Sequence, residues 1–363
     1  MYRTSPTFHD IVSSSKEHTT GFDYLRVGLA LSVLVVHAIN IGNHDLSEWM
    51  WQSWFGPIER FILPSFFALS GYLVTGSLGR NSIPQFIMLR VARIFPALIV
   101  EVLLSAFVLG ALVTTLPIKQ YVTSPEFHAY LLNMFGIIHY TLPGVFEGKA
   151  LNVQLWTIPF ELECYIAIVV FGLLGLVTRP RMFLSILSAL IVIMTIGAVW
   201  QDWYETSWNV PGRMLVIAFL CGCLAYLFRH SLRHSPGLFA GSVILSYVFL
   251  YVPNLVFLAA MPLTYATVYI GLLRLPKIPF GDISYGVYLF HFPIARTIHE
   301  LSGETMGWPL LLVLTLGLSG LFATGSWRLV EKPVLGQKRA LLAATDRACQ
   351  WFVRPWQARK ALP

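Results

Sequence analysis

The sequence predicts an all-α integral membrane protein with about ten transmembrane helices. Of its 363 residues, 56% are hydrophobic and only 12% are charged, whereas an ordinary soluble domain carries about 25% charged residues. Apolar runs long enough to cross about 30 Å of hydrocarbon recur from one end of the chain to the other. We therefore expect a single membrane domain, with no stretch left over for a sizeable soluble one.

Ten apolar segments predict the spans in order. They are residues 24–41, 57–77, 94–116, 155–177, 183–200, 213–228, 237–252, 255–273, 282–300 and 308–330. An even number places both termini on one side. Only Pro253 and Asn254 separate the seventh segment from the eighth, and fusion of the two would make the number odd.

Two polar tails frame the predicted membrane domain, which covers residues 21–333. Residues 1–20 lack the apolar core of a cleavable signal peptide and are expected to form a cytosolic N-terminal tail. Residues 334–363 are expected to form a cytosolic C-terminal tail. Neither a disulfide framework nor a metal site is indicated, because Cys221 and Cys223 fall on different faces of one helix.

The distribution of basic residues predicts the orientation. With both termini on one side, that side holds 20 of the 25 lysines and arginines, and the opposite side holds five. Cytoplasmic segments of membrane proteins carry such an excess, so both termini are expected to be cytoplasmic. The net charge of +7 therefore reflects flanking residues, and no nucleic-acid partner is expected.

His37 places an ionisable ring deep inside the first apolar helix. Ionisable residues inside a bilayer are costly and usually mark functional sites. Arg26 precedes it on almost the same helix face, about 16 Å away at 1.5 Å per residue. This face is expected to be polar at its cytosolic entrance and titratable at depth. The alternative is a histidine that only hydrogen-bonds a neighbouring helix.

Arg90 and Arg93 form a second polar cluster, at the expected cytosolic mouth of the third span. Residues at i and i+3 share a helix face. Two guanidinium groups at a membrane entrance suit a phosphate-bearing ligand, because each donates bidentate hydrogen bonds and keeps its charge. The alternative is ordinary basic flanking of a span or contact with lipid headgroups.

Two further clusters lie in the fourth and ninth spans. Glu161 and Tyr165 share a helix face, whereas Glu163 lies about 200° around the helix from Glu161, so we favour Glu161 as the functional acid. In the ninth span, a polar stripe predicts either a substrate path or hydrogen bonding between helices. The stripe consists of Ser284, Tyr288, His291 and Ala295.

Taken together and in this order, six segments resemble the acyltransferase-3 family of bacterial inner-membrane O-acyltransferases. They are residues 26–37, 66–73, 90–93, 156–165, 284–293 and 331–333. The chain departs from the family pattern at Cys164, where an aromatic residue is usual, and at the additional acid Glu163. Few residues follow the last segment, so the resemblance implies a member without a fused periplasmic domain.

The resemblance implies His37 as the catalytic histidine, Glu161 as a required acid, and Arg90 and Arg93 as residues near coenzyme A. The full set of candidate site residues follows. Catalytic candidates are His37 and Glu161; coenzyme A-binding candidates are Arg26, Arg90 and Arg93; substrate-path candidates are Ser70, Tyr72, Trp156, Tyr165, Ser284, Tyr288 and His291.

The implied reaction uses a cytosolic acyl-coenzyme A, most often acetyl-coenzyme A, as a donor substrate, with no permanently bound cofactor. The acceptor would be a hydroxyl of a carbohydrate or glycolipid at the periplasmic face of the bacterial inner membrane, among membrane lipids. We expect neutral His37 to act as general base, while Glu161 either orients the imidazole or binds the sugar. A transient acyl-histidine also remains open.

Two points stay open at the level of sequence. A multi-span transporter or flippase for an acidic or sugar-linked solute would also need intramembrane histidine, arginine and glutamate. The outer loops carry five tryptophans that either stack on sugar rings or form an interfacial aromatic belt. These are Trp49, Trp51, Trp54, Trp203 and Trp208.

Overall fold

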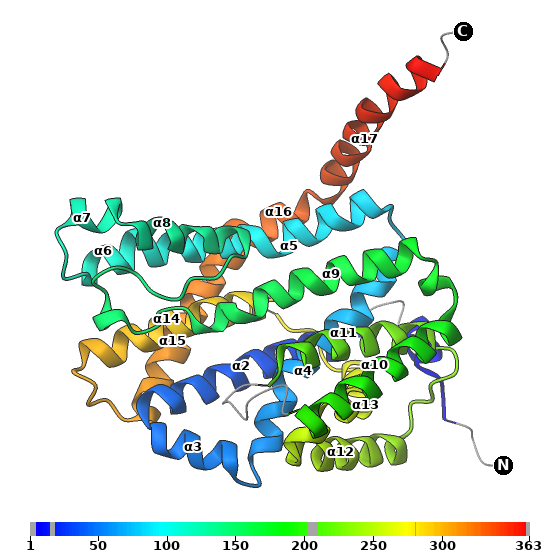
Figure 1. The fold of residues 1–363 in the computed structure, drawn as a ribbon, viewed down its shortest axis with the longest axis horizontal. Helices are drawn as coiled ribbons and strands as arrows, with labels where there is room; N and C mark the ends of the chain where they lie inside the picture. The colour runs from blue at the N-terminus through cyan, green and yellow to red at the C-terminus, as the bar shows by residue number, and fades with distance from the viewer. Residues whose placement is uncertain (1–4, 15–18, 202–209, 280, 361–363) are drawn as a thin grey trace.

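The protein is a bundle of helices, seen here in a computed structural model that describes residues 5–14, 19–201, 210–279 and 281–360. The described residues form no β-strand. Trp203, Trp208 and the outermost residues of both predicted tails lie outside the described residues. The outer-loop helices α7 and α8 lie at one end of the bundle, and α17 leaves it at the other (Figure 1).

The helices follow one another along the chain without any long strand or soluble insertion among the described residues. Their bounds are α1 Phe8–Ser14, α2 Gly21–Gly42, α3 His44–Gln52, α4 Gly56–Leu78, α5 Ile83–Leu103, η1 Leu104–Leu109, α6 Gly110–Val113, α7 Ile118–Thr123, α8 Pro125–Leu131, η2 Leu132–Phe135, η3 Phe146–Gly148, η4 Val153–Thr157, α9 Ile158–Leu173, η5 Leu176–Thr178, α10 Pro180–Gln201, α11 Gly212–Leu227, α12 Pro236–Tyr251, η6 Pro253–Ala259, α13 Ala260–Gly271, α14 Ser284–Leu301, α15 Trp308–Ser326, η7 Trp327–Glu331, α16 Lys332–Gly336 and α17 Lys338–Lys360.

The all-α membrane fold predicted from the sequence is confirmed. Each of the ten expected spans coincides with a helix. Among the described residues, seven helices are long and apolar enough to cross a membrane; α11, α12 and α14 occupy the three remaining expected positions. The seventh and eighth segments do not fuse, because the chain is extended at Val252 between α12 and η6.

The third span begins earlier than the sequence pattern predicted. Helix α5 starts at Ile83 rather than at residue 94, because Ser82 and Gln85 form a capping box and a proline occupies the first turn. Helix α5 therefore extends about three turns before the predicted start of the span, and Arg90 and Arg93 lie within it. Arg90 lies about two turns and Arg93 about three turns from the start of the helix.

Close packing of α4 against α11 sets the centre of the bundle. A Cβ atom on Gly71 would lie 2.0 Å from the carbonyl oxygen of Phe219, and one on Gly222 would lie 2.0 Å from that of Ala68. Only glycine permits these two backbones to approach so closely, as small residues do at many membrane helix crossings. The crossing holds the residues around Ser70 against the core.

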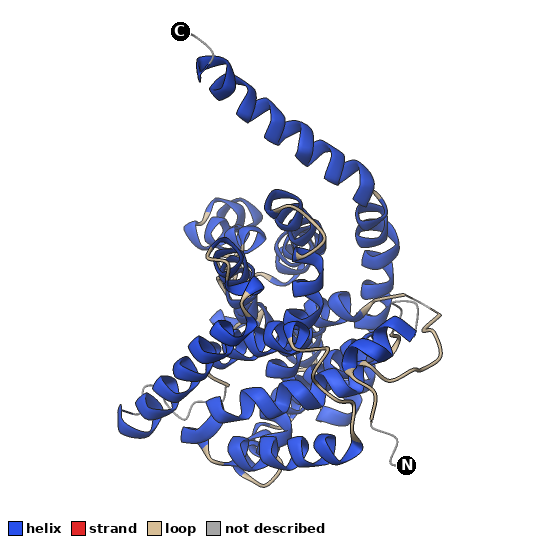
Figure 2. Cartoon of the chain, turned by 90° about the vertical axis from the view of Figure 1, so that its right-hand side faces the viewer, coloured by secondary structure: helices blue, strands red, loops and turns tan. Residues whose placement is uncertain are grey.

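The C-terminal helix α17 extends away from the bundle in both views (Figures 1 and 2). Near its start, the Gln85 side chain at the beginning of α5 donates hydrogen bonds of 2.9 Å to both oxygens of Asp346. At the other terminus, α1 packs against the connection between α11 and α12, where the Phe8 amide donates to the Leu232 carbonyl.

Candidate active site

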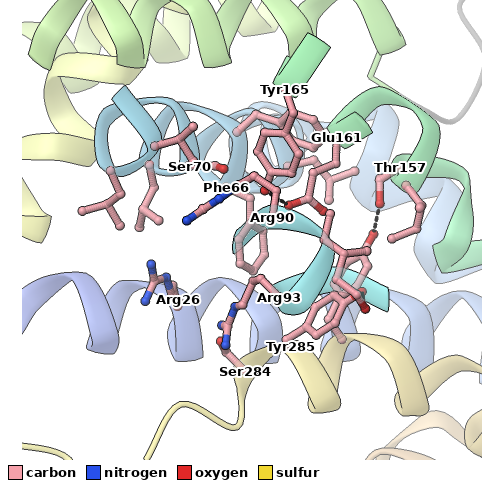
Figure 3. Close-up of a pocket in the computed structure, with 18 residues that line it drawn as sticks. Arg26, Phe66, Ser70, Arg90, Arg93, Thr157, Glu161, Tyr165, Ser284 and Tyr285 are labelled. Atoms are coloured by element: carbon pink, nitrogen blue, oxygen red, sulfur yellow. Dashed lines mark hydrogen bonds between the residues drawn. The ribbon is translucent and has the colours of Figure 1, made fainter. Parts of the chain in front are cut away.

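An inner cavity collects most of the polar residues that the sequence singled out. It has a volume of about 160 Å³ and lies between α2, α4, α5, α9 and α14. Figure 3 shows the three arginines approaching it from α2 and α5, with Glu161 and Tyr165 on the α9 side. The predicted site residues that line it are Arg26, Ser70, Arg90, Arg93, Glu161, Tyr165, Ser284 and Tyr288.

Two of the three arginines are held by acids of the protein itself. Arg93 donates to the Asp282 carboxylate over 2.6 Å, and Arg26 donates to the same oxygen over 3.3 Å. The buried Glu331 lies 3.9 Å from the other terminal nitrogen of Arg93. Asp282 lies in the connection before α14. Burial raises the pKa of its carboxyl, but Arg93 and Arg26 outweigh this and lower that pKa to about 2.

Arg90 differs from its neighbour one turn away. Among the described residues it has no carboxylate partner, and its buried Nε atom has no hydrogen-bond acceptor. Its guanidinium group instead lies 5.7 Å from the ring centroid of Phe86 and 5.8 Å from that of Tyr165. Arg90 therefore keeps its hydrogen-bonding capacity for a ligand in the inner cavity.

The two acids of α9 point to different surroundings. The Tyr165 hydroxyl donates a 2.6 Å hydrogen bond to Glu161, as their shared helix face predicted. Glu163 pairs with Arg213 at an exposed position away from the cavity. Glu161 lines the inner cavity with the arginines and His37 lines another, so the two catalytic candidates of the sequence face different cavities.

A second, outer cavity contains His37. It has a volume of about 330 Å³ and is bordered by α2, α3, α4 and α14, a size within the lower range of small-molecule sites at about 300–1,000 Å³. Trp51 and Trp156 also line it, whereas Trp49 and Trp54 are exposed. Leu63 and Tyr288 line both cavities and form the boundary between them.

Hydrogen bonds at the boundary fix Tyr288 in place. Its hydroxyl donates to the Gln154 carbonyl over 2.9 Å and lies 2.8 Å from the Thr157 hydroxyl. The Gln154 side chain donates in turn to the Leu289 carbonyl over 2.7 Å. The start of α9 and the middle of α14 are thus joined where the two cavities meet.

A hydrogen-bond chain determines which nitrogen of His37 is available. His291 Nδ1 lies 2.8 Å and 3.1 Å from the carbonyl oxygens of Tyr288 and Val287. Carbonyl oxygens only accept, so Nδ1 of His291 carries the proton and its Nε2 is an acceptor. His37 Nδ1 lies 2.7 Å from that Nε2, with the ring planes 8° apart, and therefore donates to it. The Nε2 atom of neutral His37 is left with a free lone pair.

The structure brings nearly all sequence candidates to one of these two cavities. His291 lines neither but contacts His37 directly, and it is fully buried. Tyr72 lies outside both cavities, where its ring stacks on Phe22. Asp282 was not among the residues predicted from the sequence, although an acid just before a helix that carries a polar stripe is a signal that could have identified it.

Comparison with known proteins supplies an independent finding. A family model described as an acyltransferase domain matches residues 19–324. The chain is 28% identical to Nodulation protein 10 of Rhizobium leguminosarum bv. viciae, over 91% of this chain and 98% of that protein. It is 26% identical to the O-acetyl transferase of Shigella phage Sf6, over 86% of this chain and 95% of that protein. No solved structure matches the chain.

Proposed function

The chain belongs to the acyltransferase-3 family, and we propose that it moves an acetyl group from cytosolic acetyl-coenzyme A to a hydroxyl of a sugar at the periplasmic face. It is a multi-pass membrane O-acyltransferase. The acetyl group is proposed because a relative aligned over most of both chains is named an O-acetyl transferase. The proposed location is the bacterial inner membrane.

One observation carries this proposal. An inner cavity lined by three arginines and an outer cavity lined by a histidine share a boundary formed by Leu63 and Tyr288. A donor bound by its phosphates from the cytosol and an acceptor bound from outside would meet at that boundary. This arrangement lets the acyl group cross as part of a bound substrate, without passage of the whole donor.

The donor is proposed to enter from the cytosolic side with its phosphates near Arg90. A guanidinium group presents a planar fork that matches phosphate oxygens and never loses its charge. Arg26 and Arg93 would act from positions fixed by Asp282. The inner cavity of about 160 Å³ is too small for a whole coenzyme A, so it would hold only the arm that carries the thioester.

The proposed chemistry starts from the free Nε2 atom of His37. This nitrogen takes the proton of the acceptor hydroxyl while the hydroxyl oxygen attacks the thioester carbonyl carbon. The new C–O bond forms, the C–S bond breaks, and the coenzyme A sulfur leaves with the proton returned by the imidazolium. During this step His291 holds the other nitrogen of His37, much as an orienting partner does in other histidine bases.

The other parts of the chain take supporting roles in the proposal. Glu161 belongs to the donor side, where its bond to Tyr165 places both beside Arg90. Residues 21–333 would form the catalytic membrane domain, with residues 1–20 and 334–363 as cytosolic tails. Carbohydrate or glycolipid is the proposed acceptor, among membrane lipids.

The test is release of coenzyme A from radiolabelled acetyl-coenzyme A by the purified protein, with extracted envelope glycans as acceptor. We expect release that depends on the glycans and transfer of label to them. In His37→Ala, loss of the general base should lower the rate by about 100-fold to 10,000-fold, while binding of coenzyme A persists.

The exposed Glu163→Gln variant is the matched control, because Glu163 pairs outside both cavities. A His37→Ala protein with undiminished transfer would remove His37 as the base. Movement of a solute across vesicles without any release of coenzyme A would instead favour a transporter.

A further inference from the structure

Glu59 is a buried acid of the outer cavity to which the proposed chemistry gives no task. It lies in the first turn of α4, is only 7% exposed and lines the same cavity as His37. Among the described residues it has no hydrogen bond and no ion pair. Its neighbour Arg60 is turned away and donates to the backbone carbonyls of Leu250 and Trp51 over 2.8 Å and 3.1 Å.

Two other buried acids, Glu101 and Glu331, each have at least one hydrogen-bond donor on one carboxylate oxygen, although the second oxygen of each has none among the described residues. Glu101 accepts from Ser105 and Asn152, and Glu331 accepts from Ser326. A carboxylate withdrawn from water without a partner costs free energy, so proteins normally provide one. The exception at Glu59 faces a cavity large enough for a small molecule, which indicates that a ligand provides the missing donors.

Arg296 of α14 lines the same cavity and has an unsatisfied donor. Its Nε atom is buried and has no acceptor among the described residues. The charge of Arg296 is already matched, because its terminal nitrogen lies 3.4 Å from Glu300. The Nε–H group is therefore a hydrogen-bond donor without an acceptor, on a guanidinium group whose charge is already balanced. Glu59, in contrast, offers acceptor oxygens without a donor among the described residues.

A sugar ring fits this combination of groups. Adjacent hydroxyls donate to a carboxylate, a ring or hydroxyl oxygen accepts from an N–H group, and the apolar ring face packs on aromatic side chains. Trp51, Trp156 and Phe292 supply aromatic surface in the cavity. We propose that Glu59 and Arg296 anchor the acceptor sugar through two adjacent hydroxyls and one further oxygen, with another hydroxyl presented to His37.

The charge at Glu59 also selects the class of sugar. A carboxylate that lines a cavity repels an anionic ligand and accepts hydrogen bonds from a neutral one. The anchoring site should therefore favour a neutral sugar over the corresponding uronic acid. This inference rests on the proposed function, because it assumes that the outer cavity receives the acceptor.

The experiment compares methyl glucoside with methyl glucuronide as acceptor probes, with acetyl-coenzyme A as donor and the whole purified protein. KM values for donor and acceptor are measured separately for the wild type and for Glu59→Gln. Arg296→Lys is the second variant, since it keeps the charge beside Glu300 and removes Nε. Glu48→Gln is the matched control, because Glu48 lies on α3, does not line the cavity and accepts a hydrogen bond from Gln52.

We expect Glu59→Gln to raise the KM for methyl glucoside by about tenfold to a hundredfold, as loss of a charged hydrogen-bond partner does. The KM for acetyl-coenzyme A should stay unchanged, which also shows that the variant is folded. The preference of the wild type for the glucoside over the glucuronide should narrow in the variant. Glu48→Gln should match the wild type in every constant.

Two results would overturn the inference, and they are distinguishable. If the wild type acetylates the probes and Glu59→Gln retains the acceptor KM, the anchoring site is wrong and the proposed function stands. If the wild type acetylates neither probe and no extracted glycan, the proposed function fails and the acceptor site fails with it.

Discussion

The two cavities differ in how each keeps its polar groups inside a membrane domain. In the inner cavity, fixed charges balance one another, because Asp282 holds Arg93 and Arg26. At the outer cavity, His37 donates one hydrogen bond to His291, which in turn donates to backbone carbonyls, so neutral groups are held by the positions of their protons. One side is organised by charge and the other by the position of a proton.

This difference separates the two tasks of an acyl transfer. A donor with phosphates needs permanent positive charge, and permanent charge is held in position by counter-charges. Proton removal from a hydroxyl needs a group that gains and loses a proton near neutral pH, and such a group requires a defined tautomer. Substitutions that change only the charge of the inner cavity, or only the tautomer of His37, can test whether the two tasks are separate.

The largest effect within the outer cavity is expected at His291, which acts through His37 as a positioning residue. In His291→Phe, the acceptor for His37 Nδ1–H is lost, and kcat should fall by about 100-fold or more because the base is no longer held in one tautomer. Both KM values should stay near those of the wild type. Steady-state kinetics with acetyl-coenzyme A and the best glycan acceptor would measure this.

The rescue variant is His291→Gln, whose side-chain carbonyl accepts from His37 Nδ1–H. We expect it to recover a large part of the lost kcat. If the Gln and Phe variants lose the same kcat and both alter the KM values, His291 supports only packing. The outer cavity would then not depend on the tautomer of His37, and the contrast with the ion-paired inner cavity would not hold.

Much of this site could be predicted from the sequence, because polar residues are rare in an apolar chain. His37, Arg90, Arg93 and Glu161 stand out for that reason. Their division between two cavities could not be predicted, since it depends on how α2, α4 and α9 pack. The hydrogen bond between His37 and His291 joins residues 254 positions apart, and no local pattern indicates such a pairing.

The helix boundaries also could be predicted only in part from the sequence. Long apolar runs identified each span, but the helix that contains the third run begins at Ile83, before the predicted residue 94. The capping box at Ser82 and Gln85 was a local signal that should have prevailed. Arg93 pairs with Asp282, which lies 189 positions away along the chain, and the sequence alone does not reveal that partner.

A second prediction compares two arginines one turn apart on α5. Arg93→Gln removes the shorter of the two arginine contacts of Asp282 and the arginine nearest to Glu331, and it should lower the free energy of unfolding by about 3 kcal/mol, as breaking a buried ion pair does. Arg90→Gln leaves no acid unpaired among the described residues and should change stability little. It should instead raise the KM for acetyl-coenzyme A about tenfold through loss of phosphate hydrogen bonds.

Thermal unfolding in detergent together with donor kinetics would separate these effects. Equal losses of stability in the two variants would show that the protein does not distinguish a structural arginine from a ligand-binding one. An unchanged donor KM in Arg90→Gln would remove Arg90 from the donor site.

The smallest expected effect concerns pH and tests whether charge organises the inner cavity. The pKa of Asp282 is lowered from 3.8 to about 2, so its ionised form stabilises the fold by about 2 kcal/mol. A lowered carboxyl pKa gives stability that is present above about pH 4 and lost as pH falls to about 2. In thermal unfolding, the wild type should therefore be more stable than Asp282→Asn by the full difference above about pH 4. As pH falls to about 2, the contribution of the Asp282 charge to that difference should be lost. An advantage that stays constant across the window would mean that hydrogen bonding by Asp282, and not its charge, positions Arg26 and Arg93.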